Sequence, residues 1–376
     1  MTIEETLAKL VAINSVSSNS NVEIISYLST RAREAGFEIK QFPYTDESGM
    51  AKINMIALAG ATISDQTIAE LALVGHTDTV PFSKTWTDAL ELTELDGKLY
   101  GRGSCDTKGF IAAALTAVDK IDLARLKRPL ALVFTADEEV GCIGAKRLAD
   151  LRPLSINHAI VGEPTSLQPM RAGKGYCLAE IIVRGREGHS AYPALGASAI
   201  FRAARLVVEI EKIAEVLKSE TCEDFDPPFT TLNVGLIQGG TAKNIIAGEC
   251  RITLEWRPVP GQRAQHVLDL VGQAIETERR TDLDFEGEVV PLRLDEATAT
   301  PGDAPLVCML EDATGKKAGT VAFGTEAPQL TALGAQAVVL GPGDIRVAHR
   351  THEFVPIDEL HKCAEIIGKA INHFCF

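Results

Sequence analysis

The sequence lacks several features that would place it in large classes of protein. No apolar run reaches the about 18 residues that a membrane-spanning helix needs. The 8 cysteines include no Cys-x-x-Cys pair, so we expect neither a structural zinc finger nor a disulfide framework. The first residues, Met1–Thr6, carry acid where a signal peptide has a basic start. We therefore expect a cytoplasmic protein with free thiols.

Positive charge is scarce relative to negative charge. The formal net charge is −14, which argues against nucleic acid or an anionic membrane as a partner, because both need a basic surface. Most of the acidic excess is expected on the solvated surface, and a few carboxylates are expected to neutralise a cation. With 376 residues, 45% of them hydrophobic, the chain can bury a large core and divide into two units.

An apolar segment, 71–80, contains the pair His76-x-Asp78 where a predicted strand ends. Residues two apart in a strand project to the same side. The Asp78 carboxylate can therefore accept one ring N–H of His76 and leave the other nitrogen free for a metal. A polar pair at a surface turn is the alternative reading of these two residues alone.

Two further predicted strands end in acidic residues. The strand 129–136 is followed by Asp137-Glu138-Glu139, and the strand 157–162 is followed by Glu163. Asp106 lies in the glycine-rich segment 101–109, just before a predicted helix. In an open α/β sheet, ligands bind at the carboxyl ends of the strands. We expect these side chains to meet there.

Several carboxylates at one place would repel one another unless a cation holds them ionised. Two divalent metals about 3.5–4 Å apart, bridged by one carboxylate, would satisfy such a set. Imidazole and carboxylate ligands suit zinc, with cobalt or manganese as possible substitutes. We therefore predict a cofactor of two Zn²⁺ per chain.

The pattern of elements predicts an α/β fold with a mixed, mainly parallel sheet flanked by helices. A capping box at Thr2 begins a first helix, and Gly36 ends a second. We predict a first part of the main domain at 1–172, an insert at 173–292 and a second part at 293–376. The insert has the ferredoxin-like order strand, helix, strand, strand, helix, strand, at 178–183, 198–217, 231–237, 251–256, 263–277 and 283–290.

The motifs Gly75-His-Thr-Asp-Thr-Val80, Gly101-Arg-Gly-Ser-Cys-Asp106, Asp137-Glu-Glu139 and Gly162-Glu-Pro164 resemble those of the M20 di-zinc metallopeptidase and deacylase family. The resemblance covers nearly the whole chain. It implies one zinc held by His76, Asp106 and Glu163, and a second held by Asp106, Glu139 and a late histidine. It also implies Glu138 as general base and Asp78 beside the ligands. Thr107 stands where the family commonly has methionine.

The late histidine has two candidates, His349 and His352. The family pattern places its ligand four residues before a glutamate, which matches His349 with Glu353. His352 then falls where relatives often carry Asn or Asp. We predict His349 as the ligand, and His352 remains the alternative because neighbouring imidazoles can exchange roles.

In the insert, Gly188-His189-Ser-Ala-Tyr-Pro193 resembles the family's lid motif. The resemblance implies that the insert is a lid and a homodimerisation domain. His189 would then reach an active site, often the partner's, and stabilise an oxyanion. Asn244 and Arg257 resemble positions that hold the substrate's carbonyl and carboxylate, and an arginine fork suits a carboxylate. A turn residue is the alternative for His189.

The segment 323–330 resembles the substrate loop of acetylornithine deacetylases within that family. Gln329 stands where desuccinylases usually have an arginine, which favours a short neutral acyl group. We predict hydrolysis of N-acetyl-L-ornithine, a step of arginine biosynthesis, with succinyl-diaminopimelate or another N-acyl amino acid or dipeptide as alternatives. The predicted substrate-loop residues are Gly324, Thr325 and Glu326; Glu326 would meet a side-chain ammonium or else be an exposed loop acid. A non-catalytic binding protein and a lid-mediated assembly protein are the rival classes.

Overall fold

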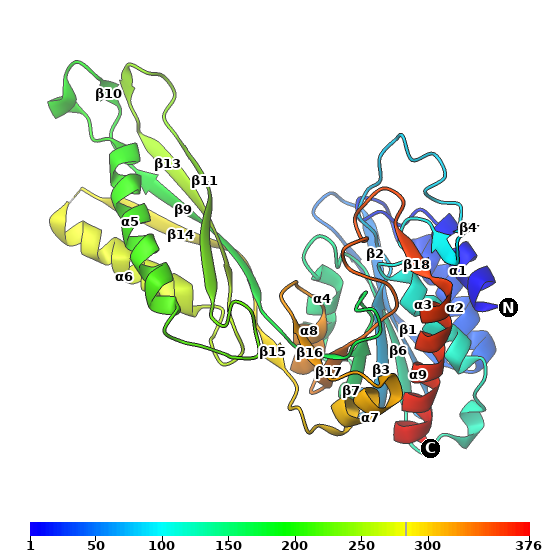
Figure 1. Ribbon diagram of the computed structural model, residues 1–376. Coiled ribbons are helices and arrows are strands. Elements are labelled where there is room, and N and C mark those ends of the chain that lie inside the picture. Colours follow the sequence, from blue (N-terminus) through cyan, green and yellow to red (C-terminus); the bar gives the residue numbers. More distant parts are fainter. Residues whose placement is uncertain (283) are drawn as a thin grey trace. The chain divides into compact units, whose positions relative to one another are not determined.

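The chain leaves its first folded unit near residue 171 and returns to it near residue 299 (Figure 1). The computed structural model describes residues 1–282 and 284–376. The first unit comprises Met1–Arg171, Ala299–Gly319 and Thr325–Phe376, and the second comprises Ala172–Thr298 and Thr320–Gly324.

The first unit is built on a sheet whose centre is parallel. The strand order is β1-β2-β6-β3-β7-β17-β8-β15, with β16 paired to β8. Strands β6, β3, β7 and β17 run parallel to one another, and β1 and β2 add an antiparallel edge. The bounds are β1 Glu38–Thr45, β2 Ala51–Ala59, β3 Ile68–His76, β6 Leu130–Thr135, β7 Ser155–Val161, β8 Met170–Gly173, β15 Thr298–Ala299, β16 Gly319–Val321 and β17 Gln336–Val339.

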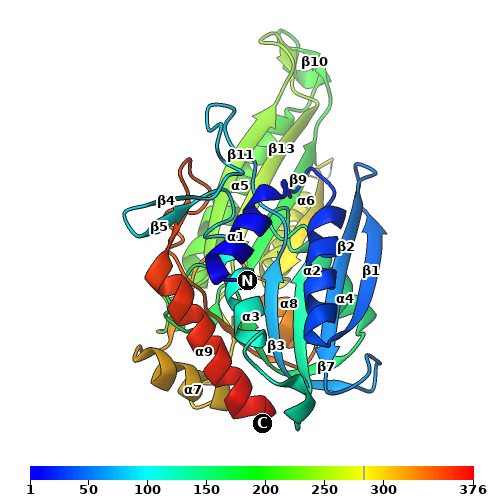
Figure 2. The same cartoon turned by 90° about the vertical axis from the view of Figure 1, so that its right-hand side faces the viewer.

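Helices cover both faces of this sheet. Along β3, Leu71 and Leu73 join one core cluster and Ala72 and Val74 join another, as expected for a strand buried on both faces. Figure 2 shows α2, α3 and α9 on one face. The bounds are α1 Ile3–Ala12, α2 Val22–Ala35, α3 Lys108–Val118, α7 Pro305–Thr314 and α9 Ile357–Cys375 for the first cluster, with α4 Ile143–Leu151 and α8 Ala327–Ala332 in the other.

The second unit has an antiparallel sheet of order β11-β13-β9-β14. With α5 after β9 and α6 after β13, this is the ferredoxin-like topology. Inward residues of β13 alternate with outward ones, and both helices pack on that inner side. The bounds are β9 Tyr176–Arg184, α5 Ala199–Leu217, β11 Thr231–Gly239, β13 Glu249–Arg257, α6 His266–Thr281 and β14 Glu286–Asp295. The predicted strand 283–290 begins at Leu283, which lies outside the described residues.

The expected helix ends at Thr2 and Gly36 are confirmed. Thr2 Oγ1 accepts the backbone N–H of Glu5, whose carboxylate accepts that of Thr2. Gly36 has φ 101°, the left-handed conformation that glycine adopts most easily. Short elements complete the structure, namely β4 Thr93–Leu95, β5 Lys98–Tyr100, β18 Phe354–Pro356, β10 Gly188–His189, β12 Ile245–Ile246 and the 3₁₀ turns η1 Leu123–Arg125 and η2 Pro193–Leu195.

None of the described helices is both long enough and apolar enough to cross a lipid bilayer. The eight cysteines are free thiols.

Candidate metal centre and active site

His76 ends β3 and presents one ring nitrogen to the acidic cluster. Its Nδ1 lies 3.0 Å from the backbone oxygen of Asp78, and its Nε2 lies 3.1 Å from Asp106 Oδ1. A carbonyl oxygen can only accept, so Nδ1 carries the hydrogen. The Nε2 lone pair is then available to a metal beside Asp106.

The carboxylate of Asp78 does not take the place expected from the His-x-Asp spacing. Its Oδ1 is 3.7 Å from His76 Nδ1, and the backbone oxygen is the closer partner. The carboxylate instead accepts Ser17 Oγ–H at 2.8 Å and the backbone N–H groups of Glu138 and Glu139 at 3.1 and 3.2 Å. Asp78 therefore anchors the acidic loop after β6 as well as orienting the imidazole.

Asp106 lies between two imidazoles at the N-terminus of α3. Its Oδ1 faces His76, while its Oδ2 is 3.2 Å from His349 Nε2. The same nitrogen of His349 is 3.0 Å from Glu139 Oε2. Each oxygen of one carboxylate thus faces a different histidine, which is the arrangement that a bridging ligand requires.

Among the described residues, His76, Asp106 and Glu139 form a group of possible metal ligands, whose ligand atoms lie within 4.8 Å of one another. His76 belongs to one predicted ligand set, Glu139 belongs to the other, and Asp106 belongs to both. Glu163 follows β7 and is also buried. The preceding Gly162 is required by packing, since a Cβ there would overlap the ring of Phe110.

The pKa values of the cluster show that its charges are unbalanced in the protein alone. Burial raises the pKa of Glu163 well above its usual range, and neighbouring Asp106 and Glu138 raise it further. Burial likewise raises the pKa of Glu139, while hydrogen bonds to Asp106 and Glu139 raise that of His349 to about 10. Divalent cations would reverse the carboxylate shifts, so the donor set fits them.

Glu138 is placed beside the ligands with a weakly acidic side chain. Burial raises its pKa to about 8, and the carboxylates of Glu139, Glu326 and Asp106 add to the effect. Its Oε1 accepts a hydrogen bond from Cys142 Sγ at 3.3 Å. A carboxylate placed beside such a cluster can act as a general base.

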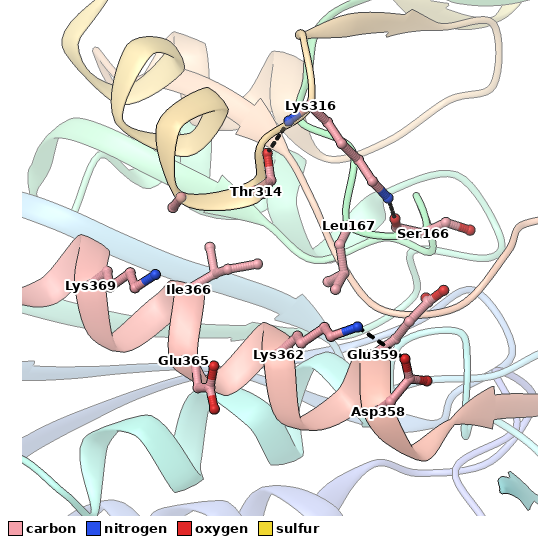
Figure 3. A pocket seen from close by; sticks show the side chains of 11 residues that line it. Ser166, Leu167, Thr314, Lys316, Asp358, Glu359, Lys362, Glu365, Ile366 and Lys369 are labelled. Carbon is pink, nitrogen blue, oxygen red and sulfur yellow. Dashed lines mark hydrogen bonds and ion pairs between the residues drawn. The ribbon is translucent and has the colours of Figure 1, made fainter.

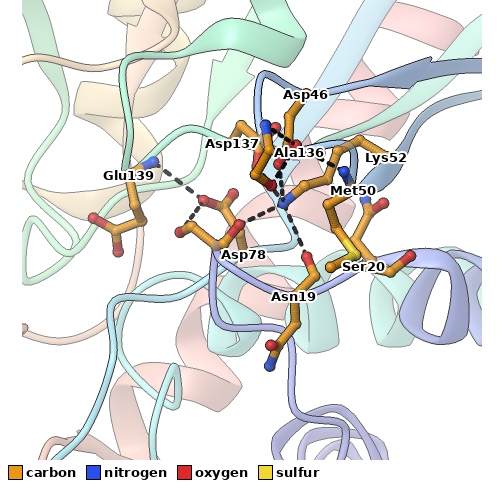
Figure 4. Close-up of polar contacts among 12 residues, drawn as sticks. Asn19, Ser20, Asp46, Met50, Lys52, Asp78, Ala136, Asp137 and Glu139 are labelled. Atoms are coloured by element: carbon orange, nitrogen blue, oxygen red, sulfur yellow. Dashed lines mark hydrogen bonds and ion pairs between the residues drawn. The ribbon is translucent and has the colours of Figure 1, made fainter.

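Sequence reasoning missed a buried network behind the acidic loop (Figure 4). Lys52 Nζ donates to Asp137 Oδ1 at 2.7 Å, and Tyr44 Oη donates to Asp137 Oδ2 at 2.8 Å. Lys52 and Asp137 are almost fully buried, and Asp137 has φ 58°. The sequence signal that could have revealed this network is Lys52, a charged residue within the otherwise mostly apolar strand β2.

Of the two candidates for the late histidine, His349 reaches the cluster. His352 is exposed and lies against Trp86, with 5.8 Å between ring centroids.

The predicted substrate-loop residues Thr325 and Glu326 are buried, so the alternative of an exposed loop acid at Glu326 is wrong. Burial raises the pKa of Glu326 to about 7.

In the second unit, His189 and Asn244 are neighbours. β10 pairs with β12, and the backbone oxygen of Asn244 accepts the N–H of Ser190. His189 Nδ1 accepts the N–H of Ala191 at 3.1 Å, so in the neutral ring Nε2 carries the hydrogen and can donate.

Arg257 lies at the opposite end of β13. From Glu249 to Arg257 this strand extends about 26 Å, at about 3.3 Å per residue. The guanidinium donates to Glu255 and to the backbone oxygen of Ala322 at 2.8 Å, and stacks on Tyr176. Gly324 lies beside Tyr176. The second unit therefore does not bring Arg257 to His189.

A separate pocket of about 290 Å³ is lined by α9 and the end of α7 (Figure 3). Lys316 donates to the backbone oxygen of Ser166, and Lys362 pairs with Asp358. None of the predicted site residues lines it. We therefore locate the chemistry at the carboxyl ends of β3, β6 and β7.

An aspartate between two imidazoles, with further buried carboxylates, at this edge of an α/β sheet is a donor set typical of metal-dependent hydrolases. The chain belongs to peptidase family M20/M25/M40, whose model matches residues 72–373.

Two curated relatives are acetylornithine deacetylases. The Myxococcus xanthus protein is 51% identical over 374 residues, covering 99% of this chain and 97% of that protein. The protein from Klebsiella pneumoniae (strain 342) is 37% identical over 365 residues, covering 95% and 92%.

Solved structures share the fold at low sequence identity. A tripeptidase from Staphylococcus aureus superposes with a TM-score of 0.76 at 23% identity, covering 99% of this chain and 97% of that one. An M20 family metallo-carboxypeptidase from Sulfolobus solfataricus gives 0.72 at 18% identity, covering 98% of both chains.

Proposed function

We propose that this protein hydrolyses N-acetyl-L-ornithine to L-ornithine and acetate in the cytoplasm, a step of arginine biosynthesis. The observation that carries the proposal is the 51% identity to an acetylornithine deacetylase over 374 residues, and the group of His76, Asp106 and Glu139 supports it. A binding protein without catalysis would not need Glu138 held beside that cluster.

We propose that two divalent cations, zinc in the first instance, are held on either side of Asp106. His76 and Glu163 would complete one site, and Glu139 and His349 the other. When bound, zinc makes a water molecule acidic enough to ionise near neutral pH. Glu138 would accept the proton of that water and return it to the leaving amine.

The two ends of the substrate need different partners. Arg257 offers a planar guanidinium to the α-carboxylate. Asn244 lies beside His189, at the other end of β13, so its amide would reach the scissile group of a substrate held by the partner subunit. Glu326 is buried, and a buried carboxylate is stabilised by a cation. We propose that it selects the side-chain ammonium. Gln329 brings no positive charge for a longer, acidic acyl group.

We propose that the second unit is a lid that also forms a homodimer. Its edge strand β11 and helix α5 expose large apolar side chains, including Leu236, Ile237, Phe201 and Val208. An unpaired edge strand is a ready surface for a second copy. Because His189 and Arg257 are a strand length apart, His189 would serve the partner's site, where its Nε2–H would donate to the oxyanion.

The test is a hydrolysis panel with zinc-loaded protein. The substrates are N-acetyl-L-ornithine, N-succinyl-diaminopimelate, a dipeptide and N-acetyl-L-norvaline, which has the carbon chain of ornithine without the terminal amine. We expect the highest kcat/KM with N-acetyl-L-ornithine and a clear loss with the norvaline compound. A higher kcat/KM for the succinyl compound or the dipeptide would overturn the proposed substrate.

A further inference from the structure

One buried carboxylate, that of Glu353, connects two segments of the chain. They are residues 101–106, the Asp106 segment, and residues 349–353, the His349 segment. Glu353 lies four residues after His349 and is 1% exposed. All four donors to its carboxylate come from the segment that ends at Asp106: Arg102 Nη1 at 2.6 Å, Gly103 N at 3.1 Å, Cys105 N at 3.0 Å and Asp106 N at 3.0 Å.

The backbone of Glu353 strengthens the same connection. Its carbonyl oxygen accepts the N–H of Gly101 at 3.1 Å. Gly103 has φ 79°, a conformation that costs glycine little, and its N–H points to the Glu353 carboxylate. The backbone of Asp106 is therefore held by a residue of the His349 segment, although the two are separated by more than two hundred positions in sequence.

We propose that Glu353 is a positioning residue, which holds the Asp106 segment against the His349 segment so that one carboxylate can face both metal positions. This inference rests on the metal-binding part of the proposed function and not on the choice of substrate. Hydrogen bonds behind metal ligands orient those ligands, and their loss typically weakens metal affinity about 10–100-fold.

A different role would be a buried ion pair that only stabilises the fold. Arg102 does pair with Glu353, and its guanidinium lies 5.2 Å from the centre of the Trp86 ring. Three of the four donors, however, are backbone N–H groups of the segment that presents Asp106. A simple ion pair would not require them.

The experiment compares E353Q with the unaltered protein. The glutamine side chain of E353Q has one NH₂ group in place of a carboxylate oxygen, and this group cannot accept the backbone N–H groups of the Asp106 segment. We therefore expect the Asp106 segment to lose its position. We expect Co²⁺ and Zn²⁺, titrated into metal-free protein by calorimetry, to bind about 10–100-fold more weakly. The visible absorption spectrum of the Co²⁺ form should also change, because that spectrum reports ligand geometry.

The matched control is E311Q. Glu311 lies on α7 and accepts the backbone N–H of Ala318 at 2.8 Å, a contact that involves neither the Asp106 segment nor the loop that carries His349. We expect E311Q to keep both the metal affinity and the Co²⁺ spectrum. If E353Q does not fold, E353D takes its place. This variant retains the charge but withdraws the carboxylate by one methylene, and we expect it to weaken metal binding as well.

The inference is overturned if folded E353Q, or folded E353D in its place, binds Co²⁺ and Zn²⁺ with unaltered affinity and spectrum, even at a lower melting temperature. That outcome would assign Glu353 to fold stability alone. The substrate panel is independent of this result, since it uses the unaltered protein, so the failure of one proposal is distinguishable from failure of the other.

Discussion

At the level of single residues, the site depends on which atoms of Asp78 and Glu138 face the cluster. Asp78 uses its backbone oxygen for His76 and its carboxylate for the backbone of Glu138 and Glu139. The backbone of Glu138 is thereby held beside the cluster. We propose separate tasks for the two acidic residues: Asp78 anchors the loop, and Glu138 transfers protons.

Replacing Glu138 by glutamine should remove proton transfer and leave metal binding intact. Loss of a general base typically costs about 10²–10⁴ in rate, so kcat for N-acetyl-L-ornithine should fall by that factor. Glu23→Gln, on the exposed side of α2, is the control and should retain full kcat. Near-normal turnover by Glu138→Gln, with metal content measured in parallel, would remove Glu138 from the mechanism.

Replacing Asp78 by asparagine should disturb the acidic loop. The amide nitrogen cannot accept the N–H groups of Glu138 and Glu139, so we expect a loss of about 10–100-fold in metal affinity or in kcat. Ser17→Ala removes only one of the three donors to Asp78 and should have a smaller effect. Steady-state kinetics with calorimetric metal titration measures both quantities, and unaltered values for Asp78→Asn would contradict the anchoring role.

Which residues meet at the site could be predicted from sequence, because strand ends in a parallel sheet share one edge. How Asp78 is turned could not be predicted, since the backbone and side-chain oxygens of one residue both lie within reach of His76. The partners from distant segments, Ser17 and Lys52, were also missed. Their contacts depend on tertiary packing, which no local spacing encodes.

At the level of elements, the antiparallel edge strands β1 and β2 support the acidic loop 137–139 that follows β6. Lys52 on β2 and Tyr44 on β1 both donate to Asp137, which lies two residues after the end of β6. Lys52 also donates to the backbone oxygens of Ser17 and Asn19. The edge strands thus fix the loop that carries Glu138 from behind.

Lys52→Met should destabilise the protein strongly, because it leaves the Asp137 carboxylate buried with its charge unpaired. Removing one member of a buried ion pair costs roughly 3–5 kcal/mol, whereas Tyr44→Phe should cost about 1 kcal/mol. Urea unfolding at a fixed zinc concentration measures both free energies. A cost for Lys52→Met no larger than that for Tyr44→Phe would show that the charge of Lys52 is unimportant.

The long elements were predictable because their periodicity or continuous burial extends over many residues. The apolar segment 53–58 predicts a strand, which the structure has as β2, and the apolar stripe of 357–374 predicts a helix, which it has as α9. The alanine-rich segment 110–121 predicts a helix, which instead runs from Lys108 to Val118. The short strands β4, β5 and β18 were missed, since segments of three residues carry no periodic signal. Helix α7 was also missed, although Pro305 at its start and Gly315 at its end are recognisable signals.

At the level of the whole molecule, the proposed dimer follows from two features of the second unit. His189 and Asn244 lie at one end of β13 and Arg257 at the other. The apolar surface of β11 and α5 is exposed in the single chain. Pairing two copies through that surface would cover it and would allow each lid to serve its partner.

Mixing two inactive variants tests this arrangement. His189→Ala and Glu138→Gln should each be nearly inactive alone, but a hybrid dimer would contain one site with Glu138 from one chain and His189 from the other. Random pairing of equal amounts should restore about a quarter of the full activity. If chains exchange, as followed by a size tag, and no activity returns, His189 does not act across the dimer.

The most direct measurement of the central claim is the zinc content of Asp106→Ala beside that of the unaltered protein, after removal of metal and reloading. The account predicts two zinc ions per unaltered chain and the loss of both in the variant, because the two positions share this carboxylate. Folded Asp106→Ala that still retains two tightly bound zinc ions would contradict it.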